Sequence, residues 1–206
     1  MNGILECLKS GCVIAHRGSR EMQNTIEGLI SAKERGVKIV EIDVIEINGR
    51  PILGHSENEL TRYTLNDALG LTELLFLVDV KSRNVDPIVD ATMGFEERVM
   101  FSADNFETAY RLRSRSDCPV GLSYFSSGIV ENPSRAVSLA IENELDALFP
   151  FIGALRKRDI KFGKENSMYF ATCVVNDEAT FALAKTYGVD GIITDFPEKF
   201  PKWEKG

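Results

Sequence analysis

The sequence predicts an α/β fold, a TIM (β/α)8 barrel with a short β-hairpin extension after its second strand. Three observations support it: eight short apolar runs, amphipathic segments between several of them, and a length of 206 residues. That length lies at the compact end of the range for this fold. We expect one domain over residues 1–206, because the chain suits one hydrophobic core and no linker divides it.

The apolar runs are short and rich in β-branched and aromatic residues, which is typical of strands buried on both faces. They span 12–18, 38–44, 74–81, 98–103, 119–124, 146–151, 168–175 and 190–196. After the second run, Asn48-Gly49 lies between two alternating segments and predicts the hairpin. The alternative is an open doubly wound sheet, which usually has fewer strands and often a glycine-rich loop after the first. The sequence contains neither GxGxxG nor GxxxxGKS/T.

Helical patterns fall between the apolar runs. Residues 24–36, 133–145 and 178–188 carry apolar positions at helical spacing, and Gly36 and Gly188 are suitable terminators. The segment 153–166 is more polar and has a less regular helical pattern. The alternation of strands and helices favours parallel strands joined by crossover helices.

Charge, hydrophobic runs and cysteine spacing narrow the possible partners and cellular location of the protein. The net charge is −7, which argues against nucleic acid or an anionic membrane surface as a partner. No stretch approaches the ~20 apolar residues of a membrane span, so we expect no stable membrane insertion. The N-terminus lacks a signal-peptide pattern, and the cysteines lack CxxC spacing, which predicts reduced thiols in a cytoplasmic protein. The sequence leaves homo-oligomerisation open.

Polar side chains occur where the predicted strands end, the place where TIM barrels carry their active sites. We therefore expect these side chains to lie close together. The candidates are His16, Arg17, Glu41, Asp43, His55, Asp79 and Lys81. Asn176 and Asp195 also lie at predicted strand ends.

The three acids among these candidates indicate a metal site. An unpaired buried carboxylate is costly, and three converging carboxylates repel one another unless a cation lies between them. Oxygen ligands suit one divalent cation such as Mg²⁺, Ca²⁺ or Mn²⁺. The alternative is a buried ion-pair network with Arg17 and Lys81, which leaves the histidines unexplained.

The chain has only two histidines, and both occur beside this acid cluster. Histidine titrates near neutral pH, so one ring can accept a proton from a nucleophile while the other donates one to a leaving oxygen. A cation would neutralise developing negative charge, and Arg17 can hold a phosphate oxygen. This set of groups suits cleavage of a small-molecule phosphodiester.

Several segments resemble, in order, the motifs of the glycerophosphodiester phosphodiesterase family. They are VIAHRG, QNTIEGLISAKERGVKIVEIDV, GRPILGH, LVDVK and GVDGIITDFP. The match runs from residue 13 to residue 197, nearly the whole chain. A lone HRG would be weak evidence, but this ordered series at fitting spacing is specific.

The resemblance implies a TIM barrel that uses a divalent metal to hydrolyse glycerophosphodiesters to sn-glycerol 3-phosphate and an alcohol. His16 and His55 match the family's general acid/base pair, and Arg17 and Lys81 match its phosphate-contacting residues. Glu41 and Asp43 match two metal ligands, and Asp79 stands where the family usually has a glutamate as the third. In the usual mechanism the substrate's 2-hydroxyl attacks phosphorus, and water then opens the cyclic phosphate.

The chain also departs from the family pattern. Met22 and Gln23 replace the proline and glutamate of a PENT motif, Ser56 follows His55 where the family has aspartate, and Cys173 replaces a tryptophan. From His55 to Asp79 is 24 positions (79 − 55), where the family usually inserts a capping subdomain, so we expect a more open site. These departures leave two alternatives: a non-hydrolytic phosphodiester-binding or regulatory barrel, and a lyase that stops at the cyclic phosphate.

Overall fold

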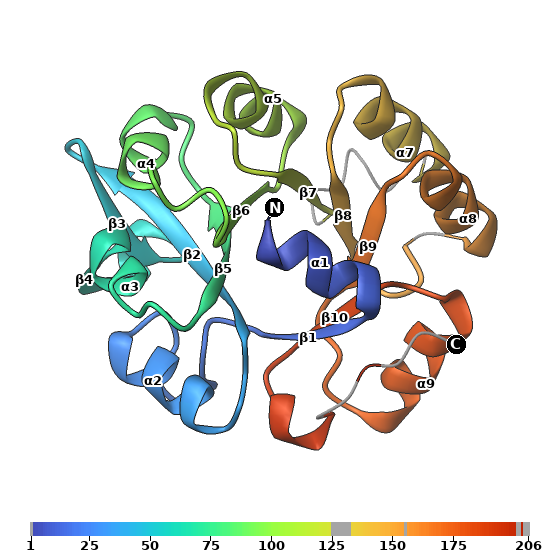
Figure 1. Cartoon of the computed structure of the whole chain (residues 1–206), viewed down its shortest axis with the longest axis horizontal. Helices are drawn as coiled ribbons and strands as arrows, with labels where there is room; N and C mark the ends of the chain where they lie inside the picture. Colours follow the sequence, from blue (N-terminus) through green and yellow to red (C-terminus); the bar gives the residue numbers. More distant parts are fainter. Residues whose placement is uncertain (1, 125–132, 155, 201–202, 204–206) are drawn as a thin grey trace.

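Eight parallel strands form a closed barrel in the computed structural model, which describes residues 2–124, 133–154, 156–200 and 203 (Figure 1). The strands are β1 (Cys12–Ala15), β2 (Ile39–Ile47), β5 (Leu75–Val80), β6 (Val99–Ala103), β7 (Val120–Tyr124), β8 (Ala147–Pro150), β9 (Tyr169–Thr172) and β10 (Gly191–Thr194). They follow one another around the ring in chain order from β1 to β10, and the pairing of β10 with β1 closes it. The predicted TIM barrel is confirmed, and each predicted apolar run overlaps one of these strands, although β2 extends three residues beyond its run.

The predicted hairpin is confirmed as well. Strand β3 (Arg50–Gly54) runs antiparallel to β2, and the two are joined by Asn48 and Gly49. Both linking residues have positive φ, 52° and 79°, as a two-residue hairpin turn of the primed type requires. A further strand, β4 (Leu60–Thr64), pairs with the outer edge of β3. These extra strands lie outside the ring.

Helices surround the barrel (Figure 1). They are α2 (Ile26–Glu34), α3 (Leu65–Leu69), α4 (Asp86–Ala91), α5 (Phe106–Arg115), α7 (Pro133–Glu142), α8 (Lys157–Glu165) and α9 (Glu178–Tyr187), with 3-10 turns η1 (Glu57–Glu59) and η2 (Pro197–Lys199). The predicted helical segments contain α2, α7, α8 and α9. Three caps agree with sequence rules: Thr25 and Asp177 accept backbone N–H bonds at the starts of α2 and α9, and Gly188 ends α9 in the left-handed region. None of the helices within the described ranges has the length and hydropathy to cross a membrane.

An N-terminal helix, α1 (Gly3–Ser10), lies across the centre of the ring in Figure 1. Asn2 caps this helix and also donates through Nδ2 to the carbonyl of Val99, at the start of β6. Ile4 and Leu8, one helical turn apart, are fully buried among side chains from inside the barrel. Helix α1 therefore closes the N-terminal end of the barrel.

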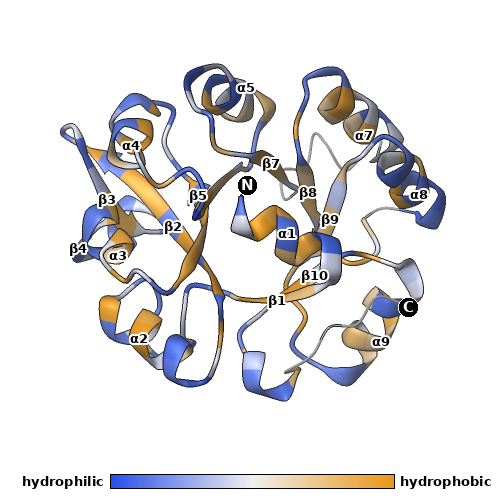
Figure 2. Ribbon diagram, in the orientation of Figure 1, coloured by the Kyte–Doolittle hydropathy of each residue, from blue (hydrophilic) through white to orange (hydrophobic). Residues whose placement is uncertain are grey.

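Strand alternation decides which side chains face the interior. Along β2, Ile39 packs in the inner cluster, whereas Val40 and Ile42 pack in the outer layer between the strands and the helices. In Figure 2 the barrel strands are coloured mainly as hydrophobic, because their side chains contribute to both the inner cluster and the outer layer. The same period of two places Glu41 and Asp43 on the inner face, within the part of β2 that pairs with β5.

Candidate active site

A cavity of about 390 Å³ lies at the C-terminal ends of the barrel strands. All seven candidate residues predicted from the sequence line it: His16, Arg17, Glu41, Asp43, His55, Asp79 and Lys81. The remaining wall is formed by Leu77, Ser102, Asp104, Ser123, Phe149, Phe151, Cys173, Val174 and Ile193. The strand-end pattern thus predicted correctly which side chains meet.

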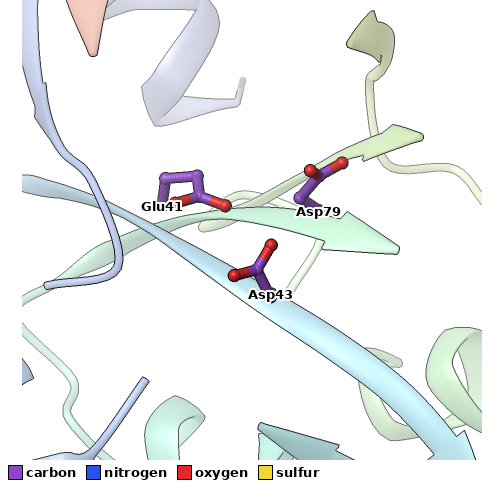
Figure 3. Close-up of side chains that lie close together, drawn as sticks. All are labelled: Glu41, Asp43 and Asp79. Carbon is purple, nitrogen blue, oxygen red and sulfur yellow. The ribbon is translucent and has the colours of Figure 1, made fainter. Parts of the chain in front are cut away.

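Three carboxylates line this cavity, and Figure 3 shows that their side chains lie close together. Glu41 and Asp43 come from β2, and Asp79 comes from the neighbouring β5, where it is the register partner of Asp43. All three are at least 95% buried, with exposed fractions of 5%, 1% and 5%. One oxygen from each lies within 4.8 Å of the other two, close enough for all three to ligate one ion.

Asp79 is held by two hydroxyls and one ammonium group. Ser102 on β6 and Ser123 on β7 donate hydrogen bonds to its Oδ1 at 2.9 and 3.2 Å. Lys81 Nζ lies 2.5 Å from Asp79 Oδ2 and 3.2 Å from Asp43 Oδ1. Burial alone would lower the pKa of Lys81, but the charges of Asp79 and Asp43 outweigh it and raise that pKa, so Lys81 stays charged.

Asp43 is the most heavily contacted of the three acids. Asn24 Nδ2 donates to its Oδ2 at 3.0 Å, and His55 Nδ1 lies 3.1 Å from its Oδ1. Arg17 Nε lies 2.8 Å from Oδ2, in an orientation that makes an ion pair but leaves this buried N–H without a hydrogen-bond acceptor among the described residues. Burial works to raise the pKa of Asp43, but the charges of Lys81 and Arg17 lower it below its ordinary value.

Glu41 is the acid whose charge is least compensated. It accepts the backbone N–H of Arg17 at 3.0 Å, and His16 Nε2 lies 4.0 Å away. Burial, followed by the charge of Asp43, raises the pKa of Glu41 to about 8. The ion pairs of the alternative network are present, yet two cations, Arg17 and Lys81, face three carboxylates. This excess of buried oxygen donors fits a hard divalent cation, which would favour the charged form of Glu41.

Two non-glycine residues in the loop after β1 have left-handed backbone. Arg17 and Asn24 have φ of 52° and 54°, and the Asn24 N–H donates to the Arg17 carbonyl at 3.0 Å. Asn24 Oδ1 also accepts the backbone N–H of Asp43 at 2.9 Å, which ties this loop to β2. Gln23, which differs from the family's usual glutamate, accepts a hydrogen bond from Arg17 Nη1 at 3.1 Å. Sequence reasoning assigned no role to Asn24, although it belongs to the NT motif.

His16 belongs to a chain of hydrogen bonds that the sequence did not predict. Its Nδ1 lies 2.7 Å from Asp195 Oδ1, and Asn176 Nδ2 donates to Asp195 Oδ2 at 2.6 Å. Burial lowers the pKa of His16, but the Asp195 hydrogen bond and the Glu41 charge outweigh it, so the net shift is upward. The bond from His16 in turn lowers the pKa of Asp195. The carboxylate fixes the Nδ1–H tautomer and leaves Nε2 as the free acceptor.

His55 follows β3, and its side chain is 42% exposed at the mouth of the cavity. Its Nδ1 contacts Arg17 Nη2 at 3.0 Å as well as Asp43. The two histidines thus approach the acid cluster from different elements, His16 from the end of β1 and His55 from the hairpin.

Fold and cavity together define a class: TIM barrels whose C-terminal mouth carries a carboxylate cluster with basic and imidazole groups around it. Solved structures that share this fold include glycerophosphodiester phosphodiesterases. One is from Parabacteroides distasonis (21% identity, TM-score 0.76, covering 92% of this chain and 95% of that chain). Another is from Thermotoga maritima (17% identity, TM-score 0.75, 92% and 96%). A phosphodiesterase from Oleispira antarctica, solved with the product sn-glycerol-3-phosphate, has 18% identity and TM-score 0.78 over 94% and 96%.

These likenesses confirm at the level of fold the resemblance that the motifs predict. No protein-family model and no curated protein matches the chain.

Proposed function

We propose that this protein is a phosphoric diester hydrolase that converts glycerophosphodiesters to glycerol phosphate and an alcohol with one divalent cation. The observation that supports the proposal is the convergence of two histidines, two basic side chains and three buried carboxylates in one cavity. The fold shared with glycerophosphodiester phosphodiesterases agrees with it.

Glu41, Asp43 and Asp79 would hold Mg²⁺, Ca²⁺ or Mn²⁺, which supplies Lewis-acid stabilisation of charge on the phosphoryl oxygens. Arg17 and Lys81 bind the phosphate. A guanidinium and an ammonium in a largely buried site are effective partners for an anion, because the local dielectric is low. Both side chains are anchored on Asp43, so the phosphate is positioned relative to the acid cluster.

His16 acts as general base. The hydrogen bond to Asp195 at Nδ1 leaves Nε2 to take the proton of the substrate's 2-hydroxyl as its oxygen attacks phosphorus. One P–O bond forms and the P–O bond to the alcohol breaks, and His55 at the cavity mouth gives its proton to the departing oxygen. Water then opens the cyclic phosphate with the proton roles reversed.

The test is incubation of metal-stripped protein with glycerophosphocholine and with bis(p-nitrophenyl) phosphate, adding Mg²⁺, Mn²⁺ or Ca²⁺ in turn. We expect metal-dependent release of glycerol phosphate, lost in His16→Ala. Accumulation of the cyclic phosphate would instead identify a lyase. Binding of the diester without turnover under any metal would identify a non-hydrolytic barrel.

A further inference from the structure

The cavity extends well beyond the acid cluster. Around the ring, β8 lies opposite β2, so Phe149 on β8 and Phe151 just after it face the cavity from the side opposite Glu41 and Asp43. Phe149 is buried, whereas Phe151 is 46% exposed. A wall with two aromatic rings can contact a part of the ligand other than the phosphate, which the charged groups across the cavity would hold.

Asp104 lies between these two sides, directly after β6. The acids of the cluster contact Arg17, Lys81 or His16, but Asp104 has no ion pair within the described part of the chain. Its carboxylate accepts one hydrogen bond, from Nδ2 of the neighbouring Asn105 at 2.8 Å. Asn105 itself caps α5 through its Oδ1 and brings no positive charge.

A partly buried carboxylate without a cationic partner opposes the entry of a phosphodiester anion, because like charges repel strongly at low dielectric. This repulsion is offset when the ligand also has a positively charged group that lies next to Asp104. An ammonium group is attracted both to the carboxylate and to the faces of nearby aromatic rings. Asp104 and Phe151 both line the cavity and supply these two kinds of contact.

The geometry points to a subsite for a cationic alcohol: Asp104 and Phe151 select phosphodiesters whose leaving alcohol bears an ammonium group, such as choline or ethanolamine. This inference rests on the proposed function, since it takes the phosphate to bind at the acid cluster. It goes further by assigning the chemical class of the alcohol to residues outside the proposed catalytic and metal-binding set.

The test measures binding separately from hydrolysis. In a His16→Ala background with Mg²⁺, calorimetry gives the affinities for glycerophosphocholine and for glycerophosphoglycerol, whose alcohol is uncharged. We expect the choline diester to bind at least about tenfold tighter. Asp104→Asn, which keeps size and removes charge, should reduce that ratio by about tenfold, and Phe151→Leu by a smaller factor.

Asp117→Asn is the matched control, because it makes the same change on an exposed residue before β7, at the opposite end of the barrel. It should leave the affinity ratio unchanged. Circular dichroism and thermal unfolding verify that each variant is folded.

An affinity ratio that Asp104→Asn does not alter would overturn the assignment, as would tighter binding of glycerophosphoglycerol or equal weakening of both ligands. Hydrolysis is assayed separately with the protein whose His16 is intact. Selective binding without release of glycerol phosphate would contradict the proposed hydrolysis and support the subsite. Hydrolysis without charge selectivity would support the proposed hydrolysis and contradict the subsite.

Discussion

At the scale of single residues, Asp195 orients the ring of His16 without lining the cavity itself. Asp195 does not line the cavity, yet its carboxylate holds the ring of a histidine that does. Asn176 fixes that carboxylate in turn, and the backbone N–H of Asp195 donates back to Asn176 Oδ1 at 2.9 Å. Asp195 is therefore a positioning residue, and Asn176 positions it.

Replacing Asp195 with asparagine should lower kcat by about 100-fold or more, because the amide no longer enforces the Nδ1–H tautomer of His16. KM should change little, since Asp195 is outside the cavity wall. Steady-state kinetics on the diester measure both constants. Asp177→Asn, which retains the cap of α9, serves as the control, and a wild-type kcat in Asp195→Asn would contradict the role.

The carboxylate cluster leads to a prediction about metal binding and stability. A cation that binds only the folded state stabilises it by about 2.7 kcal/mol at a concentration 100 times its Kd. We expect Mg²⁺, Ca²⁺ or Mn²⁺ to raise the melting temperature of the wild type, and Glu41→Gln to remove most of that rise. Differential scanning calorimetry tests this, with Glu6→Gln at an exposed position of α1 as the control. An undiminished rise in Glu41→Gln would rule out Glu41 as a ligand.

At the scale of secondary-structure elements, α7 and α8 are tied together at their first turns. Ser134 of α7 donates to Asp159 Oδ1 at 2.6 Å, while Arg156 N and Nε donate to Oδ2 at 3.1 and 2.9 Å. Burial opposes ionisation, but these bonds outweigh it and lower the pKa of Asp159 below its ordinary 3.8. The sequence predicts both helices but not this link, because it depends on residues 25 positions apart.

The sign of the Asp159 shift sets the pH range of its contribution. A lowered pKa in the folded state stabilises the protein fully above the unfolded value, and this contribution is lost as pH falls through the native value. Asp159→Asn should thus lower the free energy of unfolding at pH 7 by about 1–3 kcal/mol, with a smaller difference below about pH 3.

Urea unfolding at the two pH values measures this difference. Asp86→Asn removes an exposed ion pair with Arg115 and should cost far less at either pH. A cost for Asp159→Asn that is the same at both pH values would show that its charge is not responsible.

At the scale of the whole molecule, the barrel was predictable because each strand is buried on both faces and reads as a continuous apolar run. Helices α3 and α4 were not predicted, because five and six residues give too little periodicity to recognise. Helix α5 was missed because arginines at 111, 113 and 115 interrupt its apolar pattern. Tertiary packing, rather than local pattern, determines these helices.

The candidate site was predictable where its polar side chains lie at or near the ends of predicted strands. The cluster members lie on adjacent strands and share a face, so alternation alone places Glu41 and Asp43 together. The hydrogen bond between His16 and Asp195 could not be predicted, because it joins residues 179 positions apart where β1 pairs with β10. The hydrogen bonds from Ser102 and Ser123 to Asp79 could not be predicted either, because a strand pattern does not indicate which polar side chain contacts a carboxylate on a neighbouring strand.

Helix α1 contributes to the stability of the whole barrel. Leu8 is fully buried among the inner side chains, so Leu8→Ala should cost about 2–5 kcal/mol through lost burial and the cavity left behind. The melting temperature measures that loss, with Lys9→Ala on the exposed face of the helix as control. An unchanged melting temperature in Leu8→Ala would mean that α1 does not pack as described.

The same helix determines how molecules pass through the site. Because α1 closes the N-terminal end, a ligand reaches the cavity from the C-terminal ends of the strands. Glycerol phosphate still held near the acid cluster would occupy the place that the next diester needs. Turnover would then show competitive inhibition by this product, which would raise the apparent KM for the diester as product accumulates and leave kcat unchanged.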